Sequence, residues 1–187
     1  MPKEERGNAE PATEGGHGGD LRQRCSMVFF SENCSSVLLV ASSSREGAWV
    51  LPGGGIERGE APSACVLREL WEEAGATPAG VASGAPLCLA LSASPLQCKR
   101  SVTFPFMSLM GKLEDVYPET WRKRRWCPLA EVQASVEGSA VAAAVWGKAL
   151  EVLGGCTEPA AIRRYLQSQA EAAAAAAPGD GSLCSLA

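Results

Sequence analysis

The chain has 187 residues, of which 46% are hydrophobic and 20% are charged, so we expect a single globular domain of ordinary size. No stretch approaches the ~18 consecutive apolar residues of a membrane-spanning helix, and the N-terminus lacks the apolar core of a secretory signal. These features predict a cytoplasmic or nuclear protein without a membrane partner. The net charge of -4 argues against a stable nucleic-acid partner, because nucleic-acid-binding domains are normally strongly basic.

The eight cysteines are scattered through the sequence without a CxxC pair, and the single histidine, His17, lies in Gly-rich sequence. Structural zinc sites need closely spaced cysteine and histidine ligands, and a Ser-His-Asp triad needs a histidine within the folded domain. Both kinds of site are therefore poor interpretations of this chain.

Two tails of biased composition flank the part of the sequence with mixed hydrophobic patterning. Residues 1–21 contain almost no large apolar side chains and are predicted to be a disordered N-terminal tail. Residues 154–187 form an Ala-rich C-terminal tail, which is predicted to be helical in part after Thr157-Glu158-Pro159. The folded domain is therefore expected to span residues 22–153.

Short apolar runs alternate with turn residues through this domain and predict a sandwich of the α/β or α+β class. The segment from Ala61 to Ala74 contains helix formers, with Pro62 in its first turn and Gly75 just beyond its end, so it predicts a helix with a left-handed C-cap. A later helix is expected at residues 140–153. Strands are expected at residues 25–30, 37–40, 49–51, 87–91, 102–110 and 124–127.

Three carboxylates lie on the first predicted helix at spacings that bring them to one face. Glu69 is three residues before Glu72 and four before Glu73. Like charges at these spacings destabilise a helix unless a cation compensates, and Mg²⁺, with Mn²⁺ as the alternative, suits such oxygen ligands. Arg68 lies one turn before Glu72 and is expected to pair with Glu60 or Glu72. A solvated acidic helix face is the other interpretation of this cluster taken by itself.

The order of residues around the cluster is more specific than the cluster itself. Gly54 is followed after five residues by Glu60, and after seven more by Arg68-Glu69-Leu70-Trp71-Glu72-Glu73-Ala74-Gly75. This string resembles the signature of the Nudix hydrolases. The resemblance implies a mixed sheet sandwiched between helices, a loop-helix-loop that grips a divalent metal ion, and hydrolysis of a diphosphate linkage attached to another group.

The family pattern also implies a role for each residue of the motif. Glu69 and Glu73 correspond to metal ligands, with the carbonyl of Gly53 as an additional ligand. Glu72 corresponds to the general base, or to the carboxylate that orients water for in-line attack on phosphorus. The structural positions of the motif are Gly54, Glu60, Arg68 and Gly75.

The sequence around the motif is similar to the diphosphoinositol polyphosphate phosphohydrolase subfamily, in the triple glycine at 53–55 and in Arg122-Lys123-Arg124-Arg125-Trp126. This similarity implies a small-molecule polyphosphate as partner: removal of the β-phosphate from diphosphoinositol polyphosphates, and hydrolysis of diadenosine polyphosphates. Such ligands need several converging cations and hydroxyl donors. The candidate substrate-binding residues are Arg22, Arg24, Ser43, Ser44, Arg45, Lys99, Arg100, Arg122, Lys123 and Arg124.

Two other functions stay open at this point, as does the oligomeric state. A Nudix pyrophosphatase with another specificity would act on ADP-ribose, a nucleotide sugar or an RNA cap. A non-catalytic module that binds inositol polyphosphates would usually lack one of the motif's glutamates, whereas Glu69, Glu72 and Glu73 are all present here.

Overall fold

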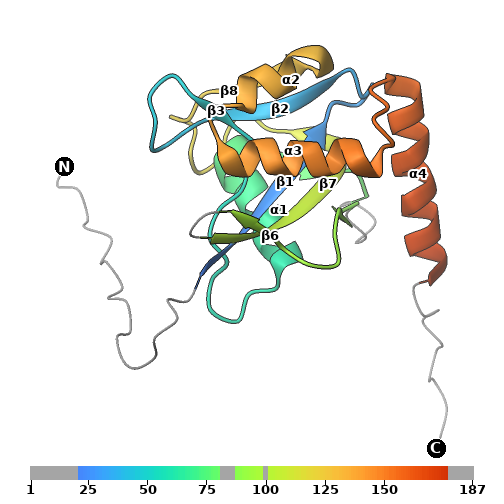
Figure 1. The fold of residues 1–187 in the computed structure, drawn as a ribbon, viewed down its shortest axis with the longest axis horizontal. Coiled ribbons are helices and arrows are strands. Elements are labelled where there is room, and N and C mark those ends of the chain that lie inside the picture. Colours follow the sequence, from blue (N-terminus) through green and yellow to red (C-terminus); the bar gives the residue numbers. More distant parts are fainter. Residues whose placement is uncertain (1–20, 81–86, 99–100, 177–187) are drawn as a thin grey trace, which may run out of the picture.

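The computed structural model describes residues 21–80, 87–98 and 101–176, which form a mixed β-sheet with helices on both faces (Figure 1). Its two long central strands, β1 (Arg22–Phe30) and β7 (Ser101–Leu113), pair in parallel. The other strands are β2 (Ser36–Ala41), β3 (Trp49–Val50), β4 (Ala76–Pro78), β5 (Leu89–Ala90), β6 (Leu96–Cys98) and β8 (Arg124–Pro128). The sheet order is β3-β2-β1-β7-β4, with β8 paired to β2 and with β5 and β6 paired to β7.

Alternating side chains of the central strands feed two hydrophobic clusters, one on each face of the sheet. Met27 and Phe29 of β1 pack on the face covered by α1 (Pro62–Ala74), against residues that include Leu70. Val28 and Phe30 pack on the other face, which is covered by three helices. These are α2 (Leu129–Val136), α3 (Ala140–Val152) and α4 (Pro159–Ala176).

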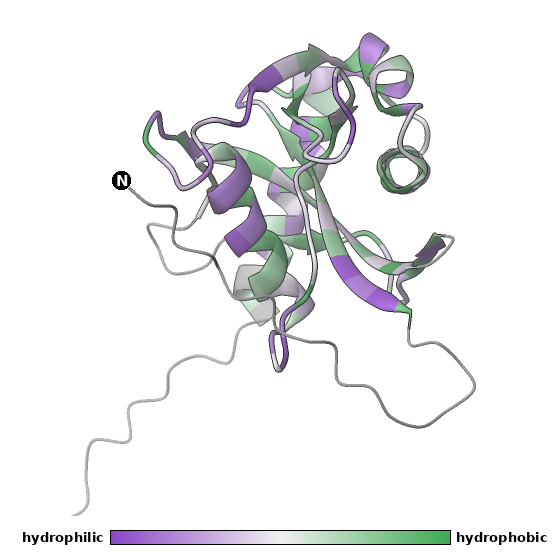
Figure 2. Cartoon of the chain, turned by 90° about the vertical axis from the view of Figure 1, so that its left-hand side faces the viewer, coloured by the Kyte–Doolittle hydropathy of each residue, from purple (hydrophilic) through white to green (hydrophobic). Residues whose placement is uncertain are grey.

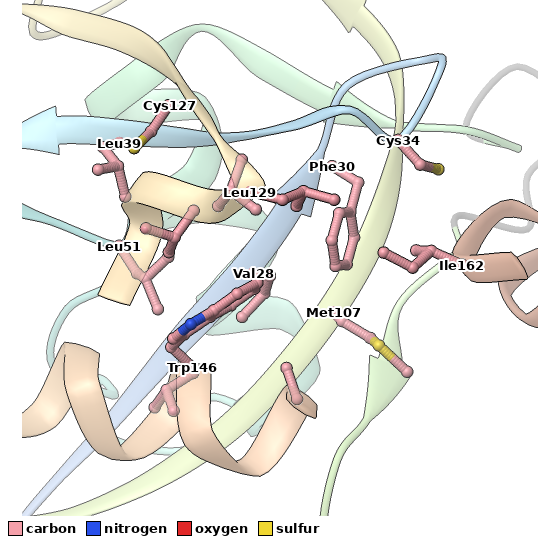
Figure 3. Close-up of a cluster of buried hydrophobic side chains, with 14 of the residues drawn as sticks. Val28, Phe30, Cys34, Leu39, Leu51, Met107, Cys127, Leu129, Trp146 and Ile162 are labelled. Atoms are coloured by element: carbon pink, nitrogen blue, oxygen red, sulfur yellow. The ribbon is translucent and has the colours of Figure 1, made fainter. Parts of the chain in front are cut away.

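The second cluster extends into the C-terminal helix. Trp146 of α3 lies over Val28, and Ile162 of α4 points toward Phe30 and Met107 (Figure 3). Figure 2 shows green, hydrophobic segments along the strands at the centre of the molecule. The core therefore reaches beyond residue 153, where we expected the domain to end.

The predicted elements agree with the structure where the hydrophobic pattern is long. The helix predicted from Ala61 to Ala74 is α1, and Gly75 caps it in the left-handed conformation with φ of 59°. The strand predicted at 87–91 is shorter than expected, since only β5 pairs there. Three elements were not predicted from the sequence: β4, β6 and α2, which are three, three and eight residues long.

Parts of the predicted tails fall outside the described residues. Residues 1–20 of the predicted disordered segment 1–21 lie outside the described residues, as do residues 177–187 of the Ala-rich tail. The helical part expected after Thr157 corresponds to α4, whose first turn is capped by Glu158 through a 2.8 Å bond to the amide of Ala161. Among the described residues, no helix is long and apolar enough to cross a membrane.

Candidate active site

The glycine loop between β3 and α1 runs along the first half of β1 as an irregular extra strand. The amides of Cys25 and Met27 donate to the carbonyls of Gly54 and Pro52, each at 2.9 Å. At Gly53, where φ is 151°, a Cβ would lie 2.3 Å from the carbonyl oxygen of Cys25. Only glycine permits this close approach, so the loop backbone is pressed against β1.

The same loop makes room for a carboxylate of α1. A Cβ on Gly54 would lie 2.3 Å from the carboxyl carbon of Glu69. The side chain of Glu69 is 13% exposed, and burial raises its pKa above the ordinary value, against the influence of Arg68. The absent side chain at Gly54 is therefore what allows Glu69 to face the cavity.

Arg68 connects three glutamates of the motif. Its Nε and Nη2 grip the carboxylate of Glu60 at 2.8 and 2.9 Å, and these bonds, with one from the amide of Glu57, lower the pKa of Glu60 to about 2. Its Nη1 donates to Glu69 at 2.9 Å and to Glu72 at 3.2 Å. The predicted pairing of Arg68 thus involves Glu60 and Glu72 together, and Glu69 as well.

Glu73 lies deepest of the carboxylates and forms an ion pair with Arg122. Their side chains are 9% and 6% exposed. The other carboxylate oxygen of Glu73 accepts from the amide of Gly53 at 3.0 Å. Burial nevertheless raises the pKa of Glu73 to about 7, because the low-dielectric surroundings disfavour the charged form more than Arg122 favours it.

Arg122 is held in place by two further contacts. Its Nε donates to the carbonyl of Ala41 at 2.8 Å, and its Nη1 also pairs with Glu119 at 3.2 Å. The guanidinium therefore ties α1 to the end of β2.

A cavity of about 650 Å³ opens beside Glu69 and Glu73. Its cationic lining comes from four arginines on three separate segments, and the loop after β2 adds hydroxyl groups. Val141 and Ala142, at the start of α3, add apolar side chains to the lining. The candidate residues brought together here are Arg22, Arg24, Ser43, Ser44, Arg45, Gly53, Gly54, Glu69, Glu73 and Arg122.

Some candidate residues lie elsewhere. Lys123 is exposed and does not line the cavity, and Arg124 points to the C-terminal end of α1, where it donates to the carbonyl of Ala74. Arg122, Lys123 and Arg124 were all expected to converge on the ligand, but successive side chains of an extended chain point in different directions. Lys99 and Arg100 lie outside the described residues. Glu72 borders the site without lining the cavity, and its side chain is 40% exposed.

Other lining residues were not predicted from the sequence, among them Ser101, Ser139, Val141 and Ala142. Ser101 lies opposite Arg22 in the parallel pairing of β1 with β7, a register that the sequence does not reveal. Ser139 is the N-cap of α3, and its side chain accepts from the amide of Ala142. Its serine type and position before the helix were the available signal.

Arg45 connects the loop between β2 and β3 to the turn between α2 and α3. Its guanidinium donates to the carbonyl of Gly138, in the turn between α2 and α3. Ser42 braces the base of the loop, since its hydroxyl accepts from the amide of Arg45 at 3.2 Å. Arg45 thus lines the cavity and also has a backbone partner in another segment, at Gly138.

Two thiols lie under the glycine loop and are part of the packing. The Sγ atoms of Cys25 and Cys65 are 2.7 Å apart, and both residues are buried. Burial raises the pKa of both thiols, so the unreactive neutral form is favoured.

The comparisons agree with this geometry. The profile described as NUDIX domain matches residues 21–145, which is more than half of the sequence. The chain belongs to the Nudix family. It is 42% identical over 57 residues to human diphosphoinositol polyphosphate phosphohydrolase 3-alpha and to human diphosphoinositol polyphosphate phosphohydrolase 2. Each match covers 30% of this chain and 35% or 32% of the relative, so the chain spans about a third of the length of these curated relatives.

Solved structures support the Nudix fold. A putative Nudix hydrolase family member from Chromobacterium violaceum has a TM-score of 0.56 at 20% identity, covering 84% of this chain and 97% of the other. An Ap4A hydrolase from C. elegans, solved as a binary complex, has a TM-score of 0.53 at 18% identity, covering 71% and 99%. The mixed sheet sandwiched between helices is thus confirmed as a Nudix fold.

Nudix hydrolases generally use divalent metal ions, and the donor chemistry of this site fits such an ion. Glu69 and Glu73 offer buried carboxylate oxygens beside the backbone of Gly53, and burial makes both carboxylates poorly compensated when ionised. Hard oxygen donors of this kind suit Mg²⁺ or Mn²⁺. Among the described residues, no three acidic, cysteine or histidine side chains converge on one point. The carboxylates are instead held by Arg68 and Arg122.

The ion pair between Glu73 and Arg122 yields a prediction about stability. Arg122→Met leaves a buried carboxylate without its partner and is expected to lower the free energy of unfolding at neutral pH by about 3 kcal/mol or more. Adding Glu73→Gln should recover part of this loss, because the uncompensated charge is removed. Urea unfolding of the two single variants and the double variant measures the coupling. Arg164→Met, on the exposed side of α4, is the matched control. Additive effects would contradict the pairing.

Proposed function

We propose that this protein catalyses divalent-metal-dependent hydrolysis of a diphosphate linkage in a densely phosphorylated small molecule. Diphosphoinositol polyphosphates, cleaved at the β-phosphate, are the first candidate substrates, and diadenosine polyphosphates are the second. One observation carries the proposal: a single cavity joins the buried carboxylates Glu69 and Glu73 to four arginines. A polyanion bound to Arg22, Arg24 and Arg45 would place a phosphate beside the carboxylates, whereas Arg122 is occupied by Glu73 and Glu119.

The cationic and hydroxyl groups that line the cavity beside the carboxylates support this substrate class. Arg24 is close enough to Glu69 to lower its pKa through charge, although burial outweighs this effect, so the basic wall begins beside the carboxylates. Arg45 and the serines of the loop after β2 supply further donors, and arginine suits phosphate through paired N–H groups. A ligand with several phosphates would use all of these contacts.

The composition of the cavity wall bears on the alternatives. Among the described lining residues none is aromatic. Trp49 lies under Arg125 and Trp126 stacks on Phe29, so neither offers a free ring to a nucleobase. This favours a substrate recognised through its phosphates over ADP-ribose, a nucleotide sugar or an RNA cap. The apolar wall at Val141 and Ala142 is the feature that favours diadenosine polyphosphates, because an adenine can pack there.

The motif residues have separate roles in the proposed reaction. Glu69, Glu73 and the carbonyl of Gly53 would hold Mg²⁺. The bound ion supplies neutralisation of phosphate oxygens and activation of water. Glu72 would accept the proton of the attacking water, or orient that water, and its partial exposure leaves it open to solvent. Arg68 holds Glu72 and Glu69 in place, and Arg22, Arg24 and Arg45 would orient the substrate.

The proposal is tested by hydrolysis, with Mg²⁺, of a diphosphoinositol polyphosphate, diadenosine hexaphosphate, ADP-ribose and a capped RNA side by side. The first is expected to be cleaved best, and Glu72→Gln should lower turnover by about 100-fold or more with the fold retained. Preference for ADP-ribose or capped RNA would refute the assigned substrate class.

Arg45→Ala should reduce cleavage of the inositol substrate more than that of the dinucleotide. Arg164→Ala on α4 is the charge-matched control.

The pKa of Glu73 predicts the pH dependence of metal binding. Since this pKa is raised to about 7, the metal-free site holds a proton below that pH, and a cation must displace it. We expect Mg²⁺ affinity to be about tenfold lower at about pH 6 than at about pH 8. Without metal, this group should make the protein less stable as pH rises through about 7, because the folded state then loses a proton it favours.

Isothermal titration calorimetry at the two pH values measures this affinity. Glu73→Gln removes the titrating group, so its residual affinity should be weak and nearly independent of pH. An equally steep pH dependence in that variant would show that another group is responsible.

A further inference from the structure

The segment between β7 and β8, residues 114–123, closes around the C-terminal end of α1. Glu72 and Glu73 lie in the last turn of this helix, directly before Ala74 and Gly75. Any contact that fixes this end of the helix therefore fixes both carboxylates. The cavity-lining arginines do not provide such contacts, apart from Arg122.

Arg124 fastens the helix end to the segment. Its Nη1 donates to the carbonyl of Ala74, the last residue of α1, and to the carbonyl of Glu114, while its Nη2 pairs with Asp115 at 3.1 Å. The last carbonyls of a helix lack intrahelical donors, and a cation is favourable there. Arg124 is 17% exposed, so these contacts are only partly open to water.

Tyr117 links Arg124 to Arg122. The guanidinium of Arg124 lies over the ring of Tyr117, 4.8 Å from the centroid. The hydroxyl of Tyr117 donates to the backbone carbonyl of Arg122 at 3.1 Å. The ring also packs against the helix end, since a Cβ on Gly75 would lie 2.7 Å from its Cδ1 atom. Tyr117 therefore contacts both the helix cap and the residue that holds Glu73.

Residues near the end of the same segment contact both Glu72 and Glu73. Arg122 forms the ion pair with Glu73, and the amide of Glu119 donates to the backbone carbonyl of Glu72 at 3.0 Å. Arg122 and Glu119 are themselves joined by an ion pair at 3.2 Å. A chain of contacts thus runs from Arg124 through Tyr117 and Arg122 to Glu73.

We propose that Arg124 and Tyr117 are positioning residues, which set the places of Glu73 and Glu72 by holding Arg122 and the end of α1. Neither lines the cavity, so they act through other residues and do not touch the substrate. The inference rests on the proposed function, because it takes Glu73 as a metal ligand. It also explains why Arg124 belongs to the basic run without facing the ligand.

Arg125 provides a matched control from the same strand. It stacks over Trp49, 4.4 Å from the ring centroid, and donates to the hydroxyl of Ser135 at 3.0 Å. It therefore has an aromatic contact and a hydrogen bond, as Arg124 does, but joins β8 to β3 and α2. Its loss tests what removing a stacked arginine does to stability alone.

The experiment compares Tyr117→Phe, Arg124→Lys, Arg124→Gln and Arg125→Gln by thermal unfolding, Mg²⁺ titration calorimetry and steady-state kinetics on the full chain. Tyr117→Phe keeps the ring and removes only the bond to Arg122. We expect this variant and Arg124→Gln to weaken Mg²⁺ binding by about tenfold or more and to lower kcat, with KM for the substrate little changed. Arg124→Lys should have a higher Mg²⁺ affinity than Arg124→Gln. Arg125→Gln should lower Tm without affecting the Mg²⁺ affinity.

The outcomes separate the two levels of the proposal. Mg²⁺ affinity and kcat within about twofold of wild type in both Tyr117→Phe and Arg124→Gln would overturn the positioning role, whatever happens to Tm. Should Arg124→Gln fail to fold, Tyr117→Phe decides alone. Wild-type Mg²⁺ binding that persists in Glu73→Gln would overturn the assigned metal ligand, and the positioning role with it. Binding that depends on Glu73 but not on Tyr117 or Arg124 refutes the positioning role only.

Discussion

The ion pair between Glu73 and Arg122 is the contact on which the organisation of this site depends. It joins α1 to the segment before β8, and through Arg122 it also reaches the carbonyl of Ala41 at the end of β2. Burying two charges is unfavourable unless they are well paired, and the raised pKa of Glu73 shows that the compensation is incomplete. The fold thus holds a carboxylate that a divalent cation can stabilise further.

The distribution of arginines follows from the same constraint. Arg68 and Arg122 hold the motif's carboxylates in separate groups, whereas Arg22, Arg24 and Arg45 lie around the cavity that Glu69 and Glu73 share. The first pair compensates the negative charge of the motif, and the second set gives the cavity a positively charged lining. A chain with a net charge of -4 can therefore present a basic pocket beside an acidic helix. Membership of the Nudix family and the arginines that line the cavity both fit chemistry on a phosphate group.

The sequence was sufficient to predict the residues of the motif and the helix that carries them. The spacing of Glu69, Glu72 and Glu73 and the glycine after Ala74 depend on local geometry, so α1 and its C-cap were predictable. The pairing of Arg68 was foreseen for the same reason. Those contacts lie within about one turn of the helix or in its adjoining loop.

Contacts made across the sheet were less accessible. Ser101 reaches the cavity because β7 pairs in parallel with β1, and Arg124 leaves it because the chain before β8 turns toward the end of α1. Neither the register nor the direction of a side chain follows from a basic run such as 122–125. The strands β4 and β6 have too few residues for a periodic pattern. In α2, Leu129, Val132 and Val136 have helical spacing, which was the available signal for this helix.

The most direct test of the account is a crystal structure with Mg²⁺ and a non-hydrolysable polyphosphate. We expect the ion about 2.0–2.1 Å from oxygens of Glu69, Glu73 and the Gly53 carbonyl, with phosphates on Arg24 and Arg45. An ion bound away from Glu73, with the pair between Glu73 and Arg122 unchanged, would contradict the central claim that this buried pair is the protein's metal-binding carboxylate with its counter-ion.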